Sequence, residues 1–224
     1  MINNALILVG GYGKRLGLIT KKTPKPLINF FNKPFLDYLI EEIIKLKPKQ
    51  IVLLCSYKKN FFIKKYKNKY KNTPVKIIIE KKPLGTGGAI HNSKKFITNN
   101  TLICNGDTFF EANKIKIKKN SKIQMFINKN INYKSNKKLN NLDINSENKI
   151  YFSNKSNLMN SGIYIVNKKL NKFLKNKVNS FEDDILPNLI NSNLVFGKIY
   201  KGKHFDIGTK KNITIFKKYV KNRN

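Results

Sequence analysis

The sequence predicts an α/β fold in which parallel strands alternate with helices in one domain. Short apolar runs of strand length recur through residues 1–111, separated by segments of helical length, a pattern that favours parallel pairing with right-handed crossovers. The length of 224 residues suits a single large domain, and 40% of the residues are hydrophobic, which is enough for a sizeable core. The sequence contains no internal repeat and no Pro/Gly/Ser-rich linker.

The first half carries the regular alternation. Residues 5–9 form an apolar run that ends in glycines, which is typical of a buried strand. Residues 35–46 place apolar side chains at helical spacing, directly after Pro34, which suits the first turn of a helix. Further strands are predicted at 51–55, 75–79 and 101–104, and further helices at 61–70 and 88–96.

The second half is less regular. Residues 112–157 are rich in lysine and asparagine, with strand-like pieces at 123–127 and 150–152. We expect this middle section to be inserted over the carboxyl edge of the sheet. Beyond it, strands are predicted at 162–166 and 194–200, and helices at 181–190 and 210–220.

The formal net charge of +34 arises from 46 basic and 12 acidic residues. By itself such a charge suggests a nucleic-acid or anionic-membrane partner. The lysines, however, are spread along the whole chain among many asparagines and isoleucines, as AT-rich genomes encode, and they are not interleaved with stacking aromatics. We therefore interpret the charge as genome composition plus a general attraction for phosphate ligands, and expect no nucleic-acid partner; polyanion binding is the alternative. Arginine occurs only at Arg15 and Arg223, so those positions stand out.

The sequence also predicts a cytoplasmic protein without a membrane partner. No apolar run approaches the roughly 20 residues of a membrane helix, and residues 1–11 lack a basic leader and a cleavage site. Cys55 and Cys104 each lie in an apolar, strand-like stretch and are expected to be reduced thiols.

A glycine-rich loop follows the first predicted strand and reads Gly10-Gly11-Tyr12-Gly13-Lys14-Arg15-Leu16. Small residues after a buried strand let the backbone approach a ligand and turn its N–H groups toward an anion. Lys14 and Arg15 add positive charge where phosphates would lie. Neither a Walker A loop nor a dinucleotide fingerprint fits, because Leu8 and Leu16 stand where those motifs need glycine. A plain strand-to-helix turn is the alternative.

The segment after this loop carries a resemblance to a known family. In Thr23-Pro24-Lys25-Pro26-Leu27 the prolines stiffen an extended stretch and hold Lys25 toward the same pocket. The order of strand, Gly-Gly-x-Gly-x-Arg-Leu, Pro-Lys-Pro-Leu and then Asn32-Lys33-Pro34 resembles the N-terminal signature of the sugar-phosphate nucleotidyltransferase family. In that family the glycine loop and its arginine hold the triphosphate and the lysine contacts phosphate. The resemblance therefore implies a triphosphate site at Gly10, Gly11, Gly13, Lys14 and Arg15, with Arg15 and Lys25 as catalytic residues.

The resemblance covers nearly the whole chain, from residue 5 to about 220. It implies a Rossmann-like three-layer α/β/α fold with a mixed, mainly parallel central sheet. It also implies one domain over residues 1–224, with a nucleotide-binding half at about 1–111 and a sugar-binding half at about 112–224.

A second glycine-rich loop follows the third predicted strand and reads Glu80-Lys81-Lys82-Pro83-Leu84-Gly85-Thr86-Gly87-Gly88-Ala89. Its position before a helix favours negative charge, although a bland turn would have the same composition. In the family such a loop lies against the nucleotide base. The form Pro-Leu-Gly-Thr-Gly-Gly resembles members that use GTP, namely the heptose 1-phosphate and mannose 1-phosphate guanylyltransferases. The resemblance thus assigns nucleotide binding to Glu80, Pro83, Gly85 and Thr86.

Two aspartates follow predicted strands. Asp107 comes directly after residues 101–104, at the edge where ligands bind in open α/β sheets, and it resembles the metal-binding aspartate of the family, where it is catalytic. Asp206 precedes the last predicted helix, where it could equally cap that helix. Two carboxylates and phosphate oxygens suit Mg²⁺, which is therefore the expected cofactor.

Weaker motifs point to the sugar side. Asn160-Ser161-Gly162-Ile163-Tyr164 resembles a family segment that meets sugar hydroxyls, which assigns Asn160 and Gly162 to this side. Glu182 resembles a sugar-binding carboxylate, or is ordinary acidity at a helix start. Lys155 lies in a degraded Phe-x-Glu-Lys-Pro segment, whose lysine grips the sugar phosphate in the family.

The reaction implied by the resemblance joins a nucleoside triphosphate to a sugar 1-phosphate and releases pyrophosphate, and GTP is the first expectation for the triphosphate. D-glycero-D-manno-heptose 1-phosphate is the first expectation for the sugar. The alternatives are mannose 1-phosphate, a uridylyl, thymidylyl or cytidylyl transferase, and, from another class, a non-catalytic sugar-nucleotide-binding module. In the family such products feed capsule or lipopolysaccharide synthesis. The sequence leaves the oligomeric state open, a homo-oligomer included.

Overall fold

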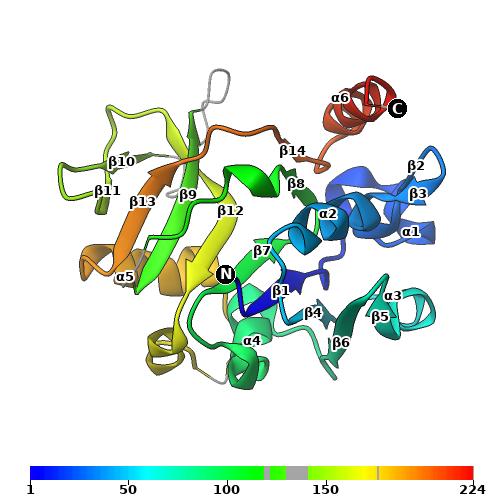
Figure 1. Ribbon diagram of the computed structural model, residues 1–224, viewed down its shortest axis with the longest axis horizontal. Helices are drawn as coiled ribbons and strands as arrows, with labels where there is room; N and C mark the ends of the chain where they lie inside the picture. Colours follow the sequence, from blue (N-terminus) through cyan, green and yellow to red (C-terminus); the bar gives the residue numbers. More distant parts are fainter. Residues whose placement is uncertain (119–121, 130–140, 176, 224) are drawn as a thin grey trace.

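The computed structural model describes residues 1–118, 122–129, 141–175 and 177–223. A central sheet of ten strands runs through these residues (Figure 1). Its strands are β1 (Asn4–Leu8), β4 (Gln50–Cys55), β5 (Asn68–Tyr70), β6 (Thr73–Ile79), β7 (Thr101–Asn105), β9 (Ile123–Lys129), β10 (Leu142–Ile144), β11 (Ile150–Phe152), β12 (Leu158–Val166) and β13 (Val195–Ile199). Two short ribbons pair outside it: β2 (Asn29–Phe30) with β3 (Lys33–Pro34), and β8 (Thr108–Phe110) with β14 (His204–Asp206).

The predicted mixed, mainly parallel sheet is confirmed. Strands β6, β4, β1 and β7 lie side by side and parallel, in register from Ala5 opposite Ile51 and Leu102. β12 runs antiparallel to β7, and β9 runs antiparallel to β12 with β13 parallel to it. Thus β9 and β13 point the same way as the first-half strands, while β5 and β12 oppose them.

The expectation for residues 112–157 was wrong. We expected this section to be inserted over the carboxyl edge of the sheet, but its described parts extend the sheet itself. β9 pairs with both β12 and β13, and the β10–β11 hairpin joins β12 through Leu142 opposite Leu158. The reason is that residues 123–127 are buried apolar side chains apart from Gln124, so they need cover on both faces.

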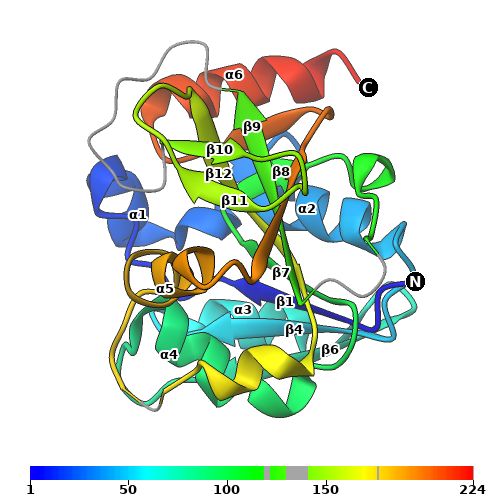
Figure 2. The same cartoon turned by 90° about the vertical axis from the view of Figure 1, so that its left-hand side faces the viewer.

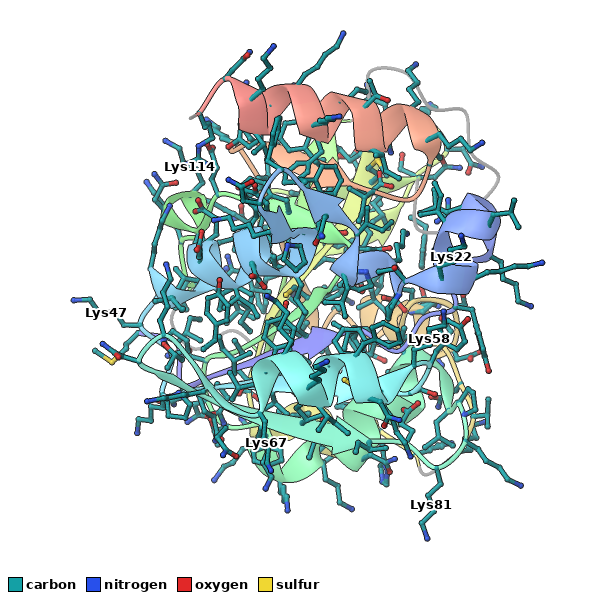
Figure 3. All side chains as sticks on the ribbon, turned by 90° about the vertical axis from the view of Figure 1, so that its right-hand side faces the viewer. Lys22, Lys47, Lys58, Lys67, Lys81 and Lys114 are labelled. Atoms are coloured by element: carbon teal, nitrogen blue, oxygen red, sulfur yellow. The ribbon has the colours of Figure 1, made fainter. Side chains whose placement is uncertain are left out.

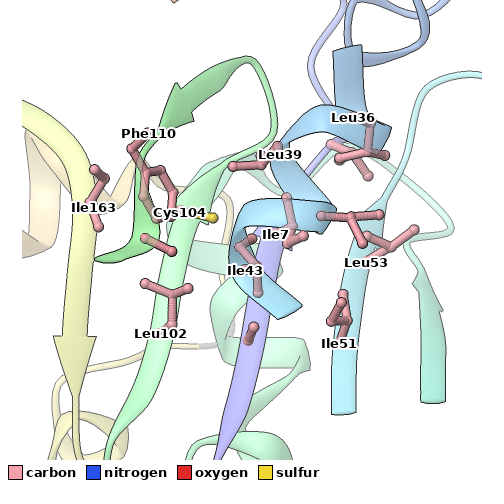
Figure 4. Close-up of a cluster of buried hydrophobic side chains, with 14 of the residues drawn as sticks. Ile7, Leu36, Leu39, Ile43, Ile51, Leu53, Leu102, Cys104, Phe110 and Ile163 are labelled. Carbon is pink, nitrogen blue, oxygen red and sulfur yellow. The ribbon is translucent and has the colours of Figure 1, made fainter. Parts of the chain in front are cut away.

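Helices cover one face of the first-half sheet and bury its alternating side chains (Figure 4). The α-helices among the described residues are α1 (Leu18–Lys22), α2 (Phe35–Ile44), α3 (Lys59–Tyr66), α4 (Gly85–Asn92), α5 (Leu186–Asn191) and α6 (Lys210–Lys221). Leu36, Leu39 and Ile43 of α2 pack on Ile7 and Leu53, and Phe62 and Tyr66 of α3 join the same cluster. Successive strand residues point to opposite faces, so Leu6 and Val52 belong to the core on the other side.

The opposite face is covered by α4, by α5 and by the π-helical turn Phe181–Ile185 that leads into α5. In the two views of the ribbon, α2 and α4 lie on opposite sides of β1 (Figures 1 and 2). Ile90 of α4 and Leu189 of α5 are fully buried in this second core. The three-layer α/β/α arrangement follows from these two cores.

Helix α6 forms a third, aromatic cluster with the β8–β14 ribbon and α2 (Figure 1). Phe216 of α6 is fully buried against Phe30, Phe35 and Phe109, with ring centroids 4.8–5.3 Å away. This cluster fixes the position of β14, and with it the residues that precede α6.

The predicted helix at 61–70 was wrong at its end. Helix α3 stops at Tyr66, and Asn68 at φ 73° begins strand β5, which pairs antiparallel with β6. Lysines and asparagines at 67–71 give no apolar face to continue a helix, and asparagine tolerates the left-handed conformation that turns the chain. Within the described ranges, none of the helices combines the length and apolar character that crossing a bilayer requires.

Candidate active site

A cavity of about 650 Å³ opens at the carboxyl ends of β1 and β7. The chain passes from β1 to β4 and β6 on one side and returns to β7 on the other, so this is the crevice where open α/β sheets bind ligands. The predicted site residues that line it are Gly10, Gly11, Gly13, Lys14, Arg15, Lys25, Glu80, Pro83, Gly85, Thr86, Asp107, Asn160 and Glu182. Three predicted residues do not line it, namely Lys155, Gly162 and Asp206.

The first glycine loop folds over one edge of the cavity. Gly13 is left-handed at φ 65°, and an alanine Cβ there would lie 2.7 Å from Thr20 Cγ2. The Thr20 hydroxyl donates toward Gly13 O and Gly17 O, each at 3.1 Å, which ties the loop to α1. Arg15 extends toward the other end of the chain, where a Cβ on Gly208 would lie 3.1 Å from its Nη2. The loop therefore brings a guanidinium beside the turn that follows Asp206.

Lys25 and Asp107 form an ion pair in the cavity. Lys25 is only 7% exposed, an unusual burial for lysine, and its Nζ donates to Asp107 Oδ2. Thr108 Oγ1 donates to the other oxygen of Asp107 at 3.3 Å. The Thr23–Leu27 segment thus delivers a cation directly to the acidic residue at the end of β7.

Asp206 is joined to Asp107 through the backbone. Ile207 N donates to Asp107 O at 3.0 Å, and Asp206 is the register partner of Thr108 in the β8–β14 ribbon. Asp206 Oδ1 accepts from Gly208 N and Oδ2 from Asn212 Nδ2, both at 2.8 Å, so its carboxylate also shapes the start of α6. The structural and the metal-binding interpretations of Asp206 are therefore compatible.

The imidazole of His204 lies between these elements. Its Nε2 donates to Ser161 O over 2.9 Å. Burial lowers the pKa of His204, against the opposing effect of that hydrogen bond and of the Asp206 and Asp107 charges. The ring serves as a structural link between β14 and β12.

The side chains of Asp107 and Asp206 are of the chemical type that binds a magnesium ion. Asp107 and Asp206 supply hard carboxylate oxygens at adjacent backbone positions. In the described part of the chain no group of three or more His, Cys, Asp or Glu side chains is placed to enclose a metal. Mg²⁺ binds proteins through one or two carboxylates and completes its shell with substrate phosphates and water, so two aspartates are sufficient.

Glu80 stands at the start of the second loop. Its side chain is 8% exposed, Oε1 has no hydrogen-bond partner among the described residues, and Oε2 accepts from Leu84 N at a long 3.4 Å. Burial raises the pKa of Glu80. An under-satisfied buried carboxylate in a cavity wall is a feature of ligand sites, because a bound donor can complete it.

The sugar-side motif lies at the junction of β12 and β7. Asn160 Oδ1 accepts from Gly162 N at 2.9 Å, and its Nδ2 donates to the buried Tyr164 hydroxyl at 2.5 Å. Gly162 is left-handed at φ 70°, and a Cβ there would lie 2.5 Å from Asn105 Nδ2. Gly162 therefore supports the cavity from behind by making room for Asn105, which does line it.

Sequence reasoning did not single out Asn105, Ser180 or Asp183 as site residues, yet all three line the cavity. For Asn105 a signal was available, because it directly follows the predicted strand at 101–104, at the sheet edge where ligands bind. Lys155 is exposed on the turn after β11, outside the cavity.

The second loop is joined to the sugar-side helix. Thr86 Oγ1 donates to Glu182 Oε2 at 2.6 Å and accepts from Phe181 N at 2.7 Å. Burial raises the pKa of Glu182, and the Thr86 hydrogen bond acts against that rise. The cavity therefore has one wall made by the first glycine loop, a floor made by the Lys25–Asp107 pair and a second wall that combines both halves of the chain.

Comparisons with known proteins agree with this arrangement. The chain matches the nucleotidyl transferase family over residues 4–132. It is 37% identical over 190 residues to the D-glycero-α-D-manno-heptose 1-phosphate guanylyltransferase of Campylobacter jejuni, covering 82% of this chain and 85% of that protein.

Solved structures add the fold. The crystal structure of HddC from Yersinia pseudotuberculosis superposes with a TM-score of 0.80 at 30% identity, covering 98% of this chain and all of that one. The same protein complexed with GMP-PN superposes with a TM-score of 0.79. The Rossmann-like fold and the enzyme class expected from the motifs are confirmed. With its motifs gathered in one cavity and this similarity along most of its length, the chain belongs to the nucleotidyl transferase family.

Proposed function

We propose that this enzyme transfers a guanylyl group from GTP to a sugar 1-phosphate, D-glycero-α-D-manno-heptose 1-phosphate, and releases pyrophosphate. The observation that carries the proposal is the meeting of the glycine loop with the Lys25–Asp107 pair in one cavity whose far wall holds Asn160 and Glu182. That cavity offers a phosphate site and a polyol site at the same crevice, as a reaction between a triphosphate and a sugar phosphate requires. The similarity to the Campylobacter heptose 1-phosphate guanylyltransferase supports the choice of substrates.

The proposed chemistry is an in-line displacement at the α-phosphorus of GTP. A sugar-phosphate oxygen forms the new P–O bond, the bond to the bridging oxygen of the β-phosphate breaks, and pyrophosphate leaves with that oxygen and its electron pair. The attacking oxygen is already an anion near neutral pH, so no side chain has to remove a proton from it. Catalysis then depends on positioning and on charge stabilisation.

Two cations of this chain are suited to stabilising that charge. Lys25 is held in place by Asp107 and by the flanking prolines, so its ammonium is preorganised at the floor of the cavity. Arg15 projects from the glycine loop toward Gly208, and none of the described residues forms an ion pair with its guanidinium. We assign Lys25 and Arg15 to the oxygens of the reacting phosphates, with the backbone of Gly11 and Gly13 as the cradle for the triphosphate.

Mg²⁺ is the proposed cofactor, with Asp107 and Asp206 as its protein ligands. When bound there it would neutralise phosphate charge and polarise the reacting phosphoryl group. Asp107 would then share its charge between the cation and Lys25, and Asp206 would keep its hydrogen bonds to Gly208 N and Asn212. The β8–β14 pairing holds the backbone of Asp206, and the hydrogen bond from Ile207 N holds that of Asp107, so both backbones are in place before any cation arrives.

The preference for GTP is supported by Glu80. Guanine is distinguished from the other bases by adjacent N1–H and N2–H₂ donors, which a carboxylate accepts as a pair. Glu80 has one under-used and one unused oxygen in the wall beside Pro83 and Gly85. Adenine presents no matching pair of donors, so a buried carboxylate that it cannot satisfy selects against ATP.

The surface charge supports a small-molecule substrate better than a polyanion. Lysines project from many elements, and Lys47, Lys81 and Lys114 point away from the ribbon in different directions (Figure 3). A nucleic-acid site would be expected to gather them along one face or groove. We assign the charge a general role in attracting phosphate-bearing substrates.

The cytoplasm is the proposed location, and surface-polysaccharide synthesis the proposed use of the product. Nucleoside triphosphates are cytoplasmic metabolites, and Cys55 and Cys104 are free, buried thiols on strands β4 and β7, separated by β1. An activated heptose is a donor for glycosyl transfer, which is the class of reaction that would consume it.

Pyrophosphate release tests the proposal directly. The enzyme, with Mg²⁺, is assayed with ATP, GTP, CTP, UTP and dTTP against a panel of sugar 1-phosphates that includes the heptose and mannose compounds. Release with GTP and the heptose alone is the expected result. Release with another pair would keep the reaction and replace the substrate, whereas no release from folded protein with any pair would favour a non-catalytic binding module.

A further inference from the structure

The base-side loop and the sugar-side segment are joined by backbone hydrogen bonds. Asn179 N donates to Leu84 O and Gly87 N donates to Asn179 O, each at 3.0 Å. Gly85 and Gly87 are required for this approach, because a Cβ on either would collide with Asn179. The glycines of the second loop are therefore explained by a contact inside the protein, and their presence does not need a ligand.

Thr86 stands in the middle of this junction. Its hydroxyl donates to Glu182 Oε2 at 2.6 Å and accepts from Phe181 N at 2.7 Å. A hydroxyl has a single proton, so its donor capacity is fully used within the protein. The 2.6 Å distance is typical of a hydroxyl bound to a carboxylate, which is stronger than a bond between neutral groups.

The carboxylate that Thr86 contacts belongs to the opposite half of the cavity. Glu182 lies at the start of the π-helical turn, lines the cavity with Asn160, and comes from residues 96 positions away in the chain. Glutamate has three rotatable side-chain bonds, so an unrestrained carboxylate would sample many positions. The Thr86 hydroxyl removes that freedom on one oxygen, and it also counteracts the burial that raises the pKa of Glu182.

We infer that Thr86 is a positioning residue for the sugar 1-phosphate, which orients the Glu182 carboxylate toward the sugar hydroxyls, and that it does not contact the nucleotide. This inference rests on the proposed function. It changes the role expected from the sequence, where Thr86 belonged to the loop against the base. It also gives the loop a second task, since one segment then places both the base wall and the sugar carboxylate.

Steady-state kinetics of four variants test the inference: Thr86→Val, Thr86→Ser, Glu182→Gln and the double variant Thr86→Val/Glu182→Gln. Valine keeps the shape of threonine without its hydroxyl. Removing a hydrogen bond to a charged group is expected to raise the KM for the sugar 1-phosphate about tenfold in Thr86→Val. The KM for GTP should stay within about twofold, because no nucleotide contact is lost.

Two further results separate positioning from general damage. Thr86→Ser retains the hydroxyl and should keep the sugar KM near that of the wild type. In the Glu182→Gln background, Thr86→Val should add little, because the carboxylate that the hydroxyl orients is already absent. The acid limb of kcat/KM for the sugar should also move to higher pH in Thr86→Val, since the hydroxyl no longer favours the charged carboxylate. Circular dichroism and Tm of each variant show whether it is folded.

The opposing outcomes are distinct. A raised GTP KM with an unchanged sugar KM in Thr86→Val or, if that variant does not fold, a loss of sugar affinity in Thr86→Ser, would overturn the inference. So would a full, additive effect of Thr86→Val in the Glu182→Gln background. If the wild-type enzyme releases no pyrophosphate, the proposed function is rejected. If the wild-type enzyme is active and Thr86→Val has the same KM for the sugar 1-phosphate, only the positioning role is rejected.

Discussion

Replacing Gly162 by alanine perturbs the support behind the active site at one point. The change adds a single methyl group where the backbone has φ 70° and where Asn105 Nδ2 lies 2.5 Å from the new Cβ. Gly162 and Asn105 are neighbours across the β12–β7 pair, in which Ile163 faces Cys104. Alanine therefore meets two separate difficulties, one in its own backbone and one in the side chain opposite.

The magnitude follows from these two terms. A left-handed conformation costs a non-glycine residue about 1–2 kcal/mol. Moving the Asn105 side chain away from its present rotamer adds about 1 kcal/mol. Gly162→Ala should therefore lower the free energy of unfolding by roughly 2–3 kcal/mol, which in a chain of this length lowers Tm by about 4–12 °C.

Thermal unfolding measures this, with two companion variants. Gly11→Ala is the matched control, because Gly11 lacks a positive φ and nothing lies within 4 Å of its added Cβ, so its Tm should stay close to that of the wild type. In the Asn105→Ala background the collision is absent, so adding Gly162→Ala should lower the free energy of unfolding only by the backbone contribution. The contribution from moving the Asn105 side chain should disappear. A Gly162→Ala protein that unfolds at the wild-type temperature would refute the backbone assignment, and a double variant with no recovery would refute the contact.

Four further predictions concern the cavity. Asp107→Asn should lower kcat by more than about 100-fold with a Tm within a few degrees of the wild type, because the amide oxygen still accepts from Lys25; near-normal turnover would remove Asp107 from the mechanism. Glu80→Gln should lower the ratio of kcat/KM for GTP to that for ATP about tenfold, because one acceptor becomes a donor; an unchanged ratio in initial-rate assays would mean that Glu80 does not read the base. Burial raises the pKa of Glu182, so as the pH falls its carboxylate should be protonated, and sugar binding lost, at a higher pH than for an ordinary glutamate. The pH profile of Glu182→Gln should retain only the titration of the substrate phosphate at about pH 6. Because its pKa is raised in the folded protein, Glu182 stabilises the fold below its unfolded-state pKa and loses that contribution as the pH rises through its folded-state pKa. Glu182→Gln should therefore unfold at a higher temperature than the wild type at alkaline pH. An equal Tm would contradict this.

The first half of the fold was predictable because its signals are local. Residues 5–9 and 51–55 are apolar runs bounded by turns, and the structure places both in the buried parallel sheet. The first glycine loop and Lys25 were singled out as site residues within one stretch of 16 residues, Gly10 to Lys25, and both line the cavity. Local patterns of this kind depend on burial and backbone geometry that neighbouring residues share.

The second half was less predictable because its structure depends on distant partners. The strands within 112–157 have short or mixed patterns, and their place in the sheet is decided by pairing with β12 and β13. The turn at Asn68 ends the helix before residue 70, to which the sequence prediction extended it. The role of Thr86 could not be anticipated either, since its partner Glu182 lies 96 positions away and no local pattern joins them. Only the folded chain shows which side of the cavity a loop residue serves.

The aromatic cluster around Phe216 has a consequence for the order in which the enzyme is made. Asp107 leaves the ribosome about a hundred residues before Ile207, the residue whose amide it holds, and closing so long a loop carries an entropic cost that the α6 contacts offset. Until β14 and α6 are synthesised, the nascent chain contains the glycine loop and Lys25 but lacks Asp206 and the docked helix. The proposed triphosphate site can thus form before β14 and α6 are made, whereas the proposed metal pair of Asp107 and Asp206 can form only after them.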